Sequence, residues 1–132
     1  MVVLISTSRK SSYGDALRHF NQAIDYFSKA VGKDEDLRRY SKHAFIHLLR
    51  SLILLKGHGY PSYTDLVSLG AVAKDLHIID EEEYGSLVEL NLKLNGFGIL
   101  ERVEIIKLFR RLVMKAEELD PYLSQQSTLF RY

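Results

Sequence analysis

The chain has 132 residues, and its 18 lysines and arginines nearly balance its 17 aspartates and glutamates, which leaves a formal charge of +1. This length suits one domain with its own core. A content of 46% hydrophobic and 27% charged residues excludes a disordered chain. The charge balance excludes a strong whole-molecule attraction to nucleic acid or to membranes. We expect one domain over residues 1–132.

Several classes of protein are excluded by residues that are missing. Without cysteine there is no disulfide, no thiolate metal site and no cysteine nucleophile. The longest apolar stretch, Phe45–Leu55, is interrupted by His47 and Arg50 and falls short of the ~20 residues of a bilayer span. No charged segment precedes Met1–Ile5, so we expect no signal peptide and a soluble, cytoplasmic protein.

The first predicted helix covers residues 13–31 and ends at Gly32. Residues 1–11 are apolar at their start but have no second strand to pair with, so we predict an extended arm there. The helix is indicated by large apolar residues that recur every three or four positions, namely Tyr13, Leu17, Phe20, Ile24, Phe27 and Val31.

The second predicted helix covers residues 34–55 and begins with three acidic residues, which the helix dipole favours. At ~100° per residue its apolar side chains cover most of its circumference, so we expect it at the centre of the fold. One narrow strip remains polar and carries Arg39, His43, His47 and Arg50.

Three more helices are predicted after the loop at residues 57–61. Ser62 and Asp65 resemble a capping box ahead of the third helix, and Asp80 caps the fourth, which ends at Asn95. The fifth is expected over residues 98–119. Its inward residues are predicted to be Val103, Ile106, Phe109, Val113 and Ala116. Five helices with short loops predict an all-α, antiparallel bundle.

The polar strip of the second helix is the candidate site. Arginine can neutralise phosphate and histidine can transfer protons, so Arg39, His43, His47 and Arg50 could bind RNA or form a ribonuclease site. The His43 and His47 pair also has the spacing of helical metal ligands, but Ala44 stands where zinc proteases carry glutamate. The alternative is an ordinary solvated face. We predict no metal and no cofactor.

Other surface features have simpler interpretations. Lys107, Arg111 and Lys115 form a second basic row, but nearby glutamates favour a salt-bridged surface. Tyrosines could stack on bases, although packing is the more common role; those considered are Tyr40, Tyr60, Tyr63 and Tyr84. Residues 121–132 form an apolar tail, which we predict to make a dimer contact through Tyr122, Leu129, Phe130 and Tyr132.

The layout of residues 13–119 resembles the HEPN-type helical domains, including their small archaeal PaREP1-like group. The resemblance lies in the end of the second helix, Ser51–Gly57, and in Tyr60–Leu66 opening the third, followed by a late leucine-rich helix. It implies an all-helical, dimeric domain. Active members of the family cleave RNA with an arginine followed four to six residues later by a histidine on a late helix.

That ribonuclease motif is not found where the family carries it. Residues 93–98 contain no histidine. Arg38 and His43 have the right separation but lie on the second helix, where they would diverge by ~140°. The sequence therefore predicts a non-catalytic, HEPN-like binding module for RNA or for a nucleotide-handling partner protein. Two alternatives stay open: a metal-independent ribonuclease that uses the strip, and a structural protein interaction module.

Overall fold

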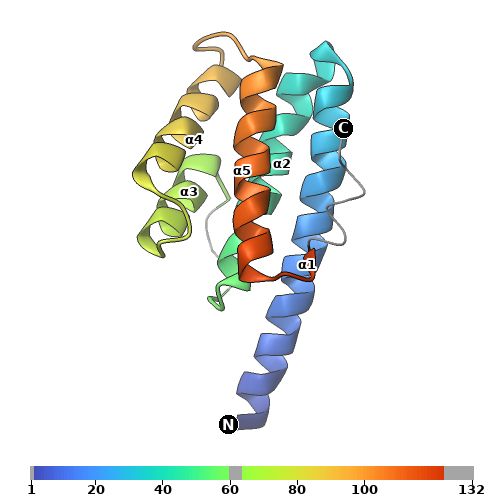
Figure 1. The fold of residues 1–132 in the computed structure, drawn as a ribbon, viewed down its shortest axis with the longest axis vertical. Coiled ribbons are helices and arrows are strands. Elements are labelled where there is room, and N and C mark those ends of the chain that lie inside the picture. The colour runs from blue at the N-terminus through green and yellow to red at the C-terminus, as the bar shows by residue number, and fades with distance from the viewer. Residues whose placement is uncertain (1, 60–63, 124–132) are drawn as a thin grey trace.

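The chain folds into five helices, seen here in a computed structural model that describes residues 2–59 and 64–123, with residues 2–12 described by their backbone alone. The helices are α1 (Val2–Gly32), α2 (Asp34–Leu55), α3 (Leu66–Asp75), α4 (Glu81–Leu94) and α5 (Arg102–Leu119) (Figure 1). No strand is present in this part of the chain. The predicted all-α bundle is confirmed at this level.

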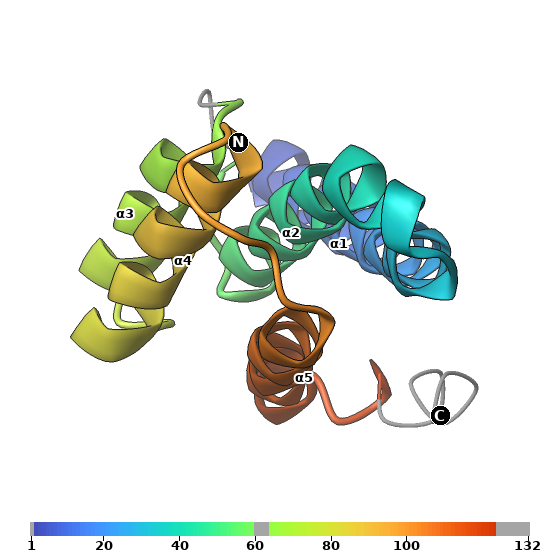
Figure 2. The same ribbon diagram turned by 90° about the horizontal axis from the view of Figure 1, so that it is seen from above.

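Helix α2 is central, as its apolar circumference predicts. It packs against α1 on one side and against α3 and α5 on others, and Figure 2 shows it between α1 and the α3–α4 pair. The core is built on aromatic contacts to α5. The Phe109 ring stacks on Phe27 of α1 at 4.0 Å between centroids and meets Phe45 of α2 edge-on at 5.4 Å.

Helix α1 differs from its prediction in two ways. It begins at Val2, so the predicted extended arm over residues 1–11 is wrong: residues 2–11 contain no glycine or proline that would interrupt a helix. Its buried face is also rotated from the predicted one. Tyr13 is exposed and Leu17, Ile24 and Val31 are half-buried. The fully buried stripe consists of Ala16, Phe20, Ala23, Phe27 and Ala30.

Helices α3 and α4 form a pair beside α2. Asp65 is the N-cap of α3, where its side chain accepts from the Ser68 amide at 2.9 Å. The prediction instead made Asp65 the second member of a capping box that begins at Ser62. Ser62 lies outside the described residues. Asp80 and Glu83 form a complete capping box at the start of α4, as predicted for Asp80. Gly70 lets the two helices approach closely, because a Cβ there would lie 3.2 Å from Leu87 Cδ1.

Helix α5 starts four residues later than predicted, at Arg102, which pairs with Asp34 at the start of α2. Phe109, Val113 and Ala116 are buried as expected. The prediction that Val103 faces inward is wrong, since Val103 is 61% exposed, and Ile106 is only half-buried. Ile105 and Leu112 complete the inward face instead.

The chain after α5 turns back against the bundle. Leu123 is buried in the core, and Tyr13 donates to Asp120 Oδ2 at 2.6 Å, which raises the pKa of Tyr13 to about 12. Of the predicted dimer contacts, Tyr122 is exposed; Leu129, Phe130 and Tyr132 lie outside the described residues.

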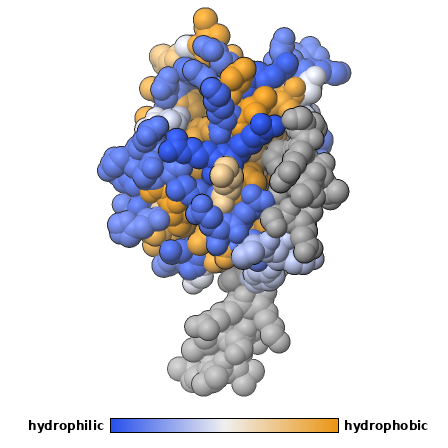
Figure 3. Space-filling model, in the orientation of Figure 1, coloured by the Kyte–Doolittle hydropathy of each residue, from blue (hydrophilic) through white to orange (hydrophobic). Residues whose placement is uncertain are grey.

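The described surface includes one apolar tip and no membrane-crossing helix. Phe97 and Ile99, in the loop between α4 and α5, are 74% and 79% exposed, and Figure 3 shows hydrophobic surface over that loop. Within the described chain, every helix is too short or too polar to cross a bilayer.

Candidate functional site

The polar strip of α2 faces α1, and the two helices together form the candidate site. Arg39 and His43 are exposed, while His47 and Arg50 are half-buried. Side chains from α1 complete the surface on the other side of the interface. We call this surface the α1–α2 seam and define it by Arg18, His19, Tyr26 and Lys29 of α1 with Arg39, Tyr40, His43, His47 and Arg50 of α2.

Tyr26 is the aromatic centre of the seam. The ring of His47 lies parallel to it, with 5.4 Å between centroids and 5° between planes. The ring of His43 stacks at 5.2 Å and that of Tyr40 at 6.2 Å. Since Tyr26 and Tyr40 are half-buried and His43 is exposed, these rings offer stacking surface beside the solvent.

Cationic groups accompany the rings at the Tyr40 end. The Lys29 ammonium lies 5.7 Å from the centroid of Tyr26 and 5.9 Å from that of Tyr40, and the Arg39 guanidinium lies 5.8 Å from Tyr40. These distances fall within the range of cation–π attraction. Exposed cations next to aromatic rings are the combination by which proteins hold the phosphates and bases of single-stranded nucleic acid.

His19 and His47 join the two helices below this surface. His19 is 2% exposed, and its Nδ1 lies 2.8 Å from Nδ1 of His47. Because each hydrogen bond needs one donor and one acceptor, one ring donates its Nδ1–H and the other accepts at an unprotonated Nδ1. The accepting ring is therefore neutral, and the two rings cannot both be protonated while they share this bond.

The surroundings of the pair favour its neutral form. Burial, the neighbouring His47 and the cations Arg18 and Arg50 lower the pKa of His19 to about 4. Burial is also the largest cause that lowers the pKa of His47, and the nearby Arg50, His43 and Arg18 lower it further. The neutral form of this pair does not supply a protonated acid, so a general acid in the seam would have to be another group.

Arg50 and Arg18 form the opposite end of the seam. The Arg50 Nε is buried and has no hydrogen-bond partner. Arg18 of α1 pairs with Asp15 at 2.9 Å, and Ser51 fixes the two helices together by donating to the Ala16 carbonyl at 2.8 Å. Positive charge thus lies at this end as well as beside Tyr40.

Arg38 has a structural role. It donates to the carbonyl oxygens of Lys93 and Leu94 at 2.7 and 2.8 Å, at the C-terminus of α4. His43 instead stacks on Tyr26 of α1. The two residues with the ribonuclease spacing therefore diverge, as the helical geometry predicts.

The second basic row is salt-bridged, as predicted for Arg111 and Lys115. Both pair with the buried Glu83, Arg111 at 3.0 Å and Lys115 at 3.4 Å, and Arg111 also contacts Glu82 at 3.4 Å. The guanidinium's acidic neighbours, Glu83 foremost, raise the pKa of Arg111. These pairs connect α4 to α5.

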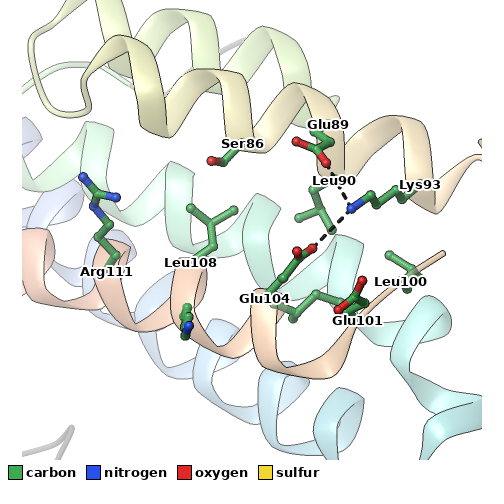
Figure 4. Close-up of a pocket in the computed structure, with 11 residues that line it drawn as sticks. Ser86, Glu89, Leu90, Lys93, Leu100, Glu101, Glu104, Leu108 and Arg111 are labelled. Atoms are coloured by element: carbon green, nitrogen blue, oxygen red, sulfur yellow. Dashed lines mark hydrogen bonds and ion pairs between the residues drawn. The ribbon is translucent and has the colours of Figure 1, made fainter. Parts of the chain in front are cut away.

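A groove of about 280 Å³ lies between α4 and α5 (Figure 4). Its polar rim is internally neutralised: Lys93 lies between Glu89 at 3.1 Å and Glu104 at 3.2 Å, and hydrogen bonds to both raise the pKa of Lys93. Its apolar floor includes Leu90, Ile105 and Leu108. With acids and bases paired across it, this groove is less suited to a polyanion than the seam is.

The described residues contain no group of three or more metal-ligating side chains. The other tyrosines considered for base stacking are not part of the seam: Lys74 lies 4.7 Å over the ring of Tyr84, which packs beside Gly70, and Tyr60 and Tyr63 lie outside the described residues. No family model matches the chain, and no curated protein or solved structure shows significant similarity to it.

Sequence reasoning missed the α1 half of the seam. His19 and Tyr26 are seven residues apart, so they share one side of α1, each directly before a buried phenylalanine. A stripe centred on Phe20 and Phe27 would have placed both at its border with α2. The predicted stripe shares Phe20 and Phe27 with the buried one, but its other members Leu17 and Ile24 lie on the opposite flank.

Proposed function

We propose that this chain is a HEPN-like, antiparallel helical bundle that binds single-stranded RNA through the α1–α2 seam and does not cleave it. The observation that supports the proposal is the set of rings Tyr26, Tyr40 and His43 lying together beside the cations Lys29 and Arg39. Aromatic rings bind bases by stacking and cations bind phosphates, and both contacts depend little on the RNA sequence.

The direct test is fluorescence anisotropy with a labelled single-stranded RNA over a series of salt concentrations. Affinity should fall as salt rises, because protein cations displace the counterions of the phosphates. Arg39→Gln should weaken binding and lower the salt slope by ~0.7, the value of one phosphate contact on a single strand. Lys107→Gln, an exposed cation of the α5 row, is the matched control and should change neither.

Stacking is tested separately from charge. Tyr40→Leu keeps an apolar side chain but removes the ring, and we expect an affinity loss of about 5-fold or more, since one stacked base contributes ~1–3 kcal/mol. Equal affinities of the wild type and of Tyr40→Leu would contradict the stacking arrangement. Failure of the wild type to bind RNA at any salt concentration would contradict the proposed function.

Incubation of the same RNA with the protein tests the absence of catalysis. We expect the strand to remain intact on a denaturing gel. Cleavage that disappears in the His43→Ala, His47→Ala double variant would overturn this part of the proposal and establish the ribonuclease alternative, with the two histidines as acid and base.

We also propose that the domain is a homodimer held by the apolar tail, including Tyr122, Leu129, Phe130 and Tyr132. Because Leu123 belongs to the core, the truncation that tests this ends after Leu123. It should convert a dimer to a monomer in light scattering. A monomeric full-length chain, or a truncated chain that remains dimeric, would contradict the contact.

A further inference from the structure

The seam has two chemically different ends. Rings and their cations occupy the part of α2 around Tyr40 and His43, whereas Arg50 of α2 and Arg18 of α1 occupy the other. At 1.5 Å per residue, Tyr40 and Arg50 are separated by ~15 Å along α2. A strand that stacks its bases on the first part brings its backbone to the arginines at the second.

Arg50 has an unmet hydrogen-bonding requirement. Its Nε is buried and without a partner, although the residue as a whole is half-exposed. A buried donor without an acceptor is costly. The Nε and Nη groups of a guanidinium form a planar fork that matches two oxygens of a phosphate. An anion at this place would supply the missing acceptor.

The charges around Arg50 are mostly positive. Besides burial, which is the largest cause, the permanent charges of Arg50 and Arg18 lower the pKa of His47, while Asp15 acts in the opposite direction on His19 and pairs with Arg18. A phosphate monoester carries about −1.5 to −2 charges at neutral pH, against one negative charge on an internal phosphodiester. Coulomb attraction therefore favours the monoester here.

On α2, the polar strip ends at Arg50. Leu54, the next position on this side of α2, is buried, so α2 offers no further group to a backbone that continues in the same direction. This end of the seam suits the end of a strand better than its middle.

We propose that the Arg50 end of the α1–α2 seam binds the terminal phosphate monoester of a single-stranded RNA whose adjacent bases stack on Tyr26 and His43. This inference rests on the proposed RNA binding and adds the substrate class: strands that carry an end phosphate. Arg50 binds the phosphate through its guanidinium fork, and Arg18 adds charge from α1.

The test compares three strands of one sequence: one with a 5′-phosphate, one with a 3′-phosphate and one with hydroxyls at both ends. One phosphorylated strand should bind the wild-type protein about 10-fold more tightly than the hydroxyl strand, the scale of one charge-assisted hydrogen bond. The arm that gains affinity identifies which end is bound. Equal affinities for all three strands would overturn the inference while leaving RNA binding in place; binding of none would overturn the proposed function itself.

Variants assign the preference to Arg50. Arg50→Gln should reduce the phosphate preference to about 2-fold or less, whereas Arg39→Gln should weaken all three strands and keep the ratio between them. If Arg50→Gln does not fold by circular dichroism, Arg50→Lys, which keeps the charge but loses the fork, should reduce the ratio. A ratio that is unchanged in the folded variant would overturn the role of Arg50.

Discussion

The Nδ1 atoms of His19 and His47 share one hydrogen bond of 2.8 Å across the interface of α1 and α2. In the folded chain the pKa of His19 is lowered to about 4, whereas the ordinary histidine pKa is 6.5. As pH falls from about 6.5 to about 4, the unfolded chain takes up this proton and the folded chain does not, so the free energy of unfolding decreases. Each pKa unit is worth about 1.4 kcal/mol, which limits the loss to about 3 kcal/mol.

Urea unfolding between about pH 7 and about pH 4.5 measures this dependence. His19→Gln cannot take up the proton and should show a flatter curve, whatever its absolute stability. His58→Gln, at an exposed histidine, should keep the wild-type slope. Parallel curves for the wild type and His19→Gln would show that the buried pair is not the cause.

Arg38 should matter for stability and not for RNA. Its two hydrogen bonds satisfy carbonyl oxygens at the end of α4, and Arg38→Met should lower the free energy of unfolding by about 1 kcal/mol. Arg39→Met, one residue along, should change it by less than about 0.5 kcal/mol. In RNA binding the order should reverse. Weaker RNA binding by Arg38→Met than by Arg39→Met would contradict the division of roles.

Glu83 is the buried carboxylate that Arg111 and Lys115 share. Glu83→Gln keeps an oxygen for the capping bond from the Asp80 amide but leaves two cations without their common partner, and we expect a loss of about 1–3 kcal/mol. The exposed neighbour Glu82 also contacts Arg111, so Glu82→Gln is the control and should cost about 0.5 kcal/mol or less. Thermal unfolding monitored by circular dichroism compares the two; equal shifts would contradict the burial argument.

Gly70 should resist enlargement. A branched side chain there must displace Leu87 and Tyr84, whose atoms lie 3.2 and 3.4 Å from the position of a Cβ. We expect Gly70→Val to cost about 1–3 kcal/mol through overpacking. Gly85→Val meets open space on α4 and should be close to neutral or slightly stabilising, because glycine is itself unfavourable in a helix. Equal denaturant midpoints for the two variants would show that α3 and α4 do not meet closely at Gly70.

Helix positions followed well from the sequence, because capping residues and glycines are local signals. Asp80 and Asn95 mark the two ends of α4 as predicted. The start of α1 did not follow, because Ser11 and Ser12 resemble a helix cap just before Tyr13, whereas the helix runs through both of them from Val2. Val103 failed for another reason: the apolar residues of α5 cover more than one side, and packing against Phe27 and Phe45 selects the face through Ile105 and Phe109.

Only the α2 half of the candidate site could be predicted from the sequence. The strip on α2 was visible because its surroundings are apolar, so four polar residues stand out at helical spacing. His19 and Tyr26 were hidden because a histidine and a tyrosine beside a buried stripe give no signal of their own until the partner helix is known. The His19 hydrogen bond to His47 joins residues 28 positions apart, and only the tertiary structure brings them together.

The central position of α2 makes the two sides of the molecule unequal under partial unfolding. Helices α3 and α4 pack on each other and on α2, with ion pairs to α5, while the seam is built from α1 and α2 alone. Opening of the α3–α4 pair would therefore leave the seam intact. In native-state hydrogen exchange the amides of α3 and α4 should lose protection as one cooperative unit, before those of α2.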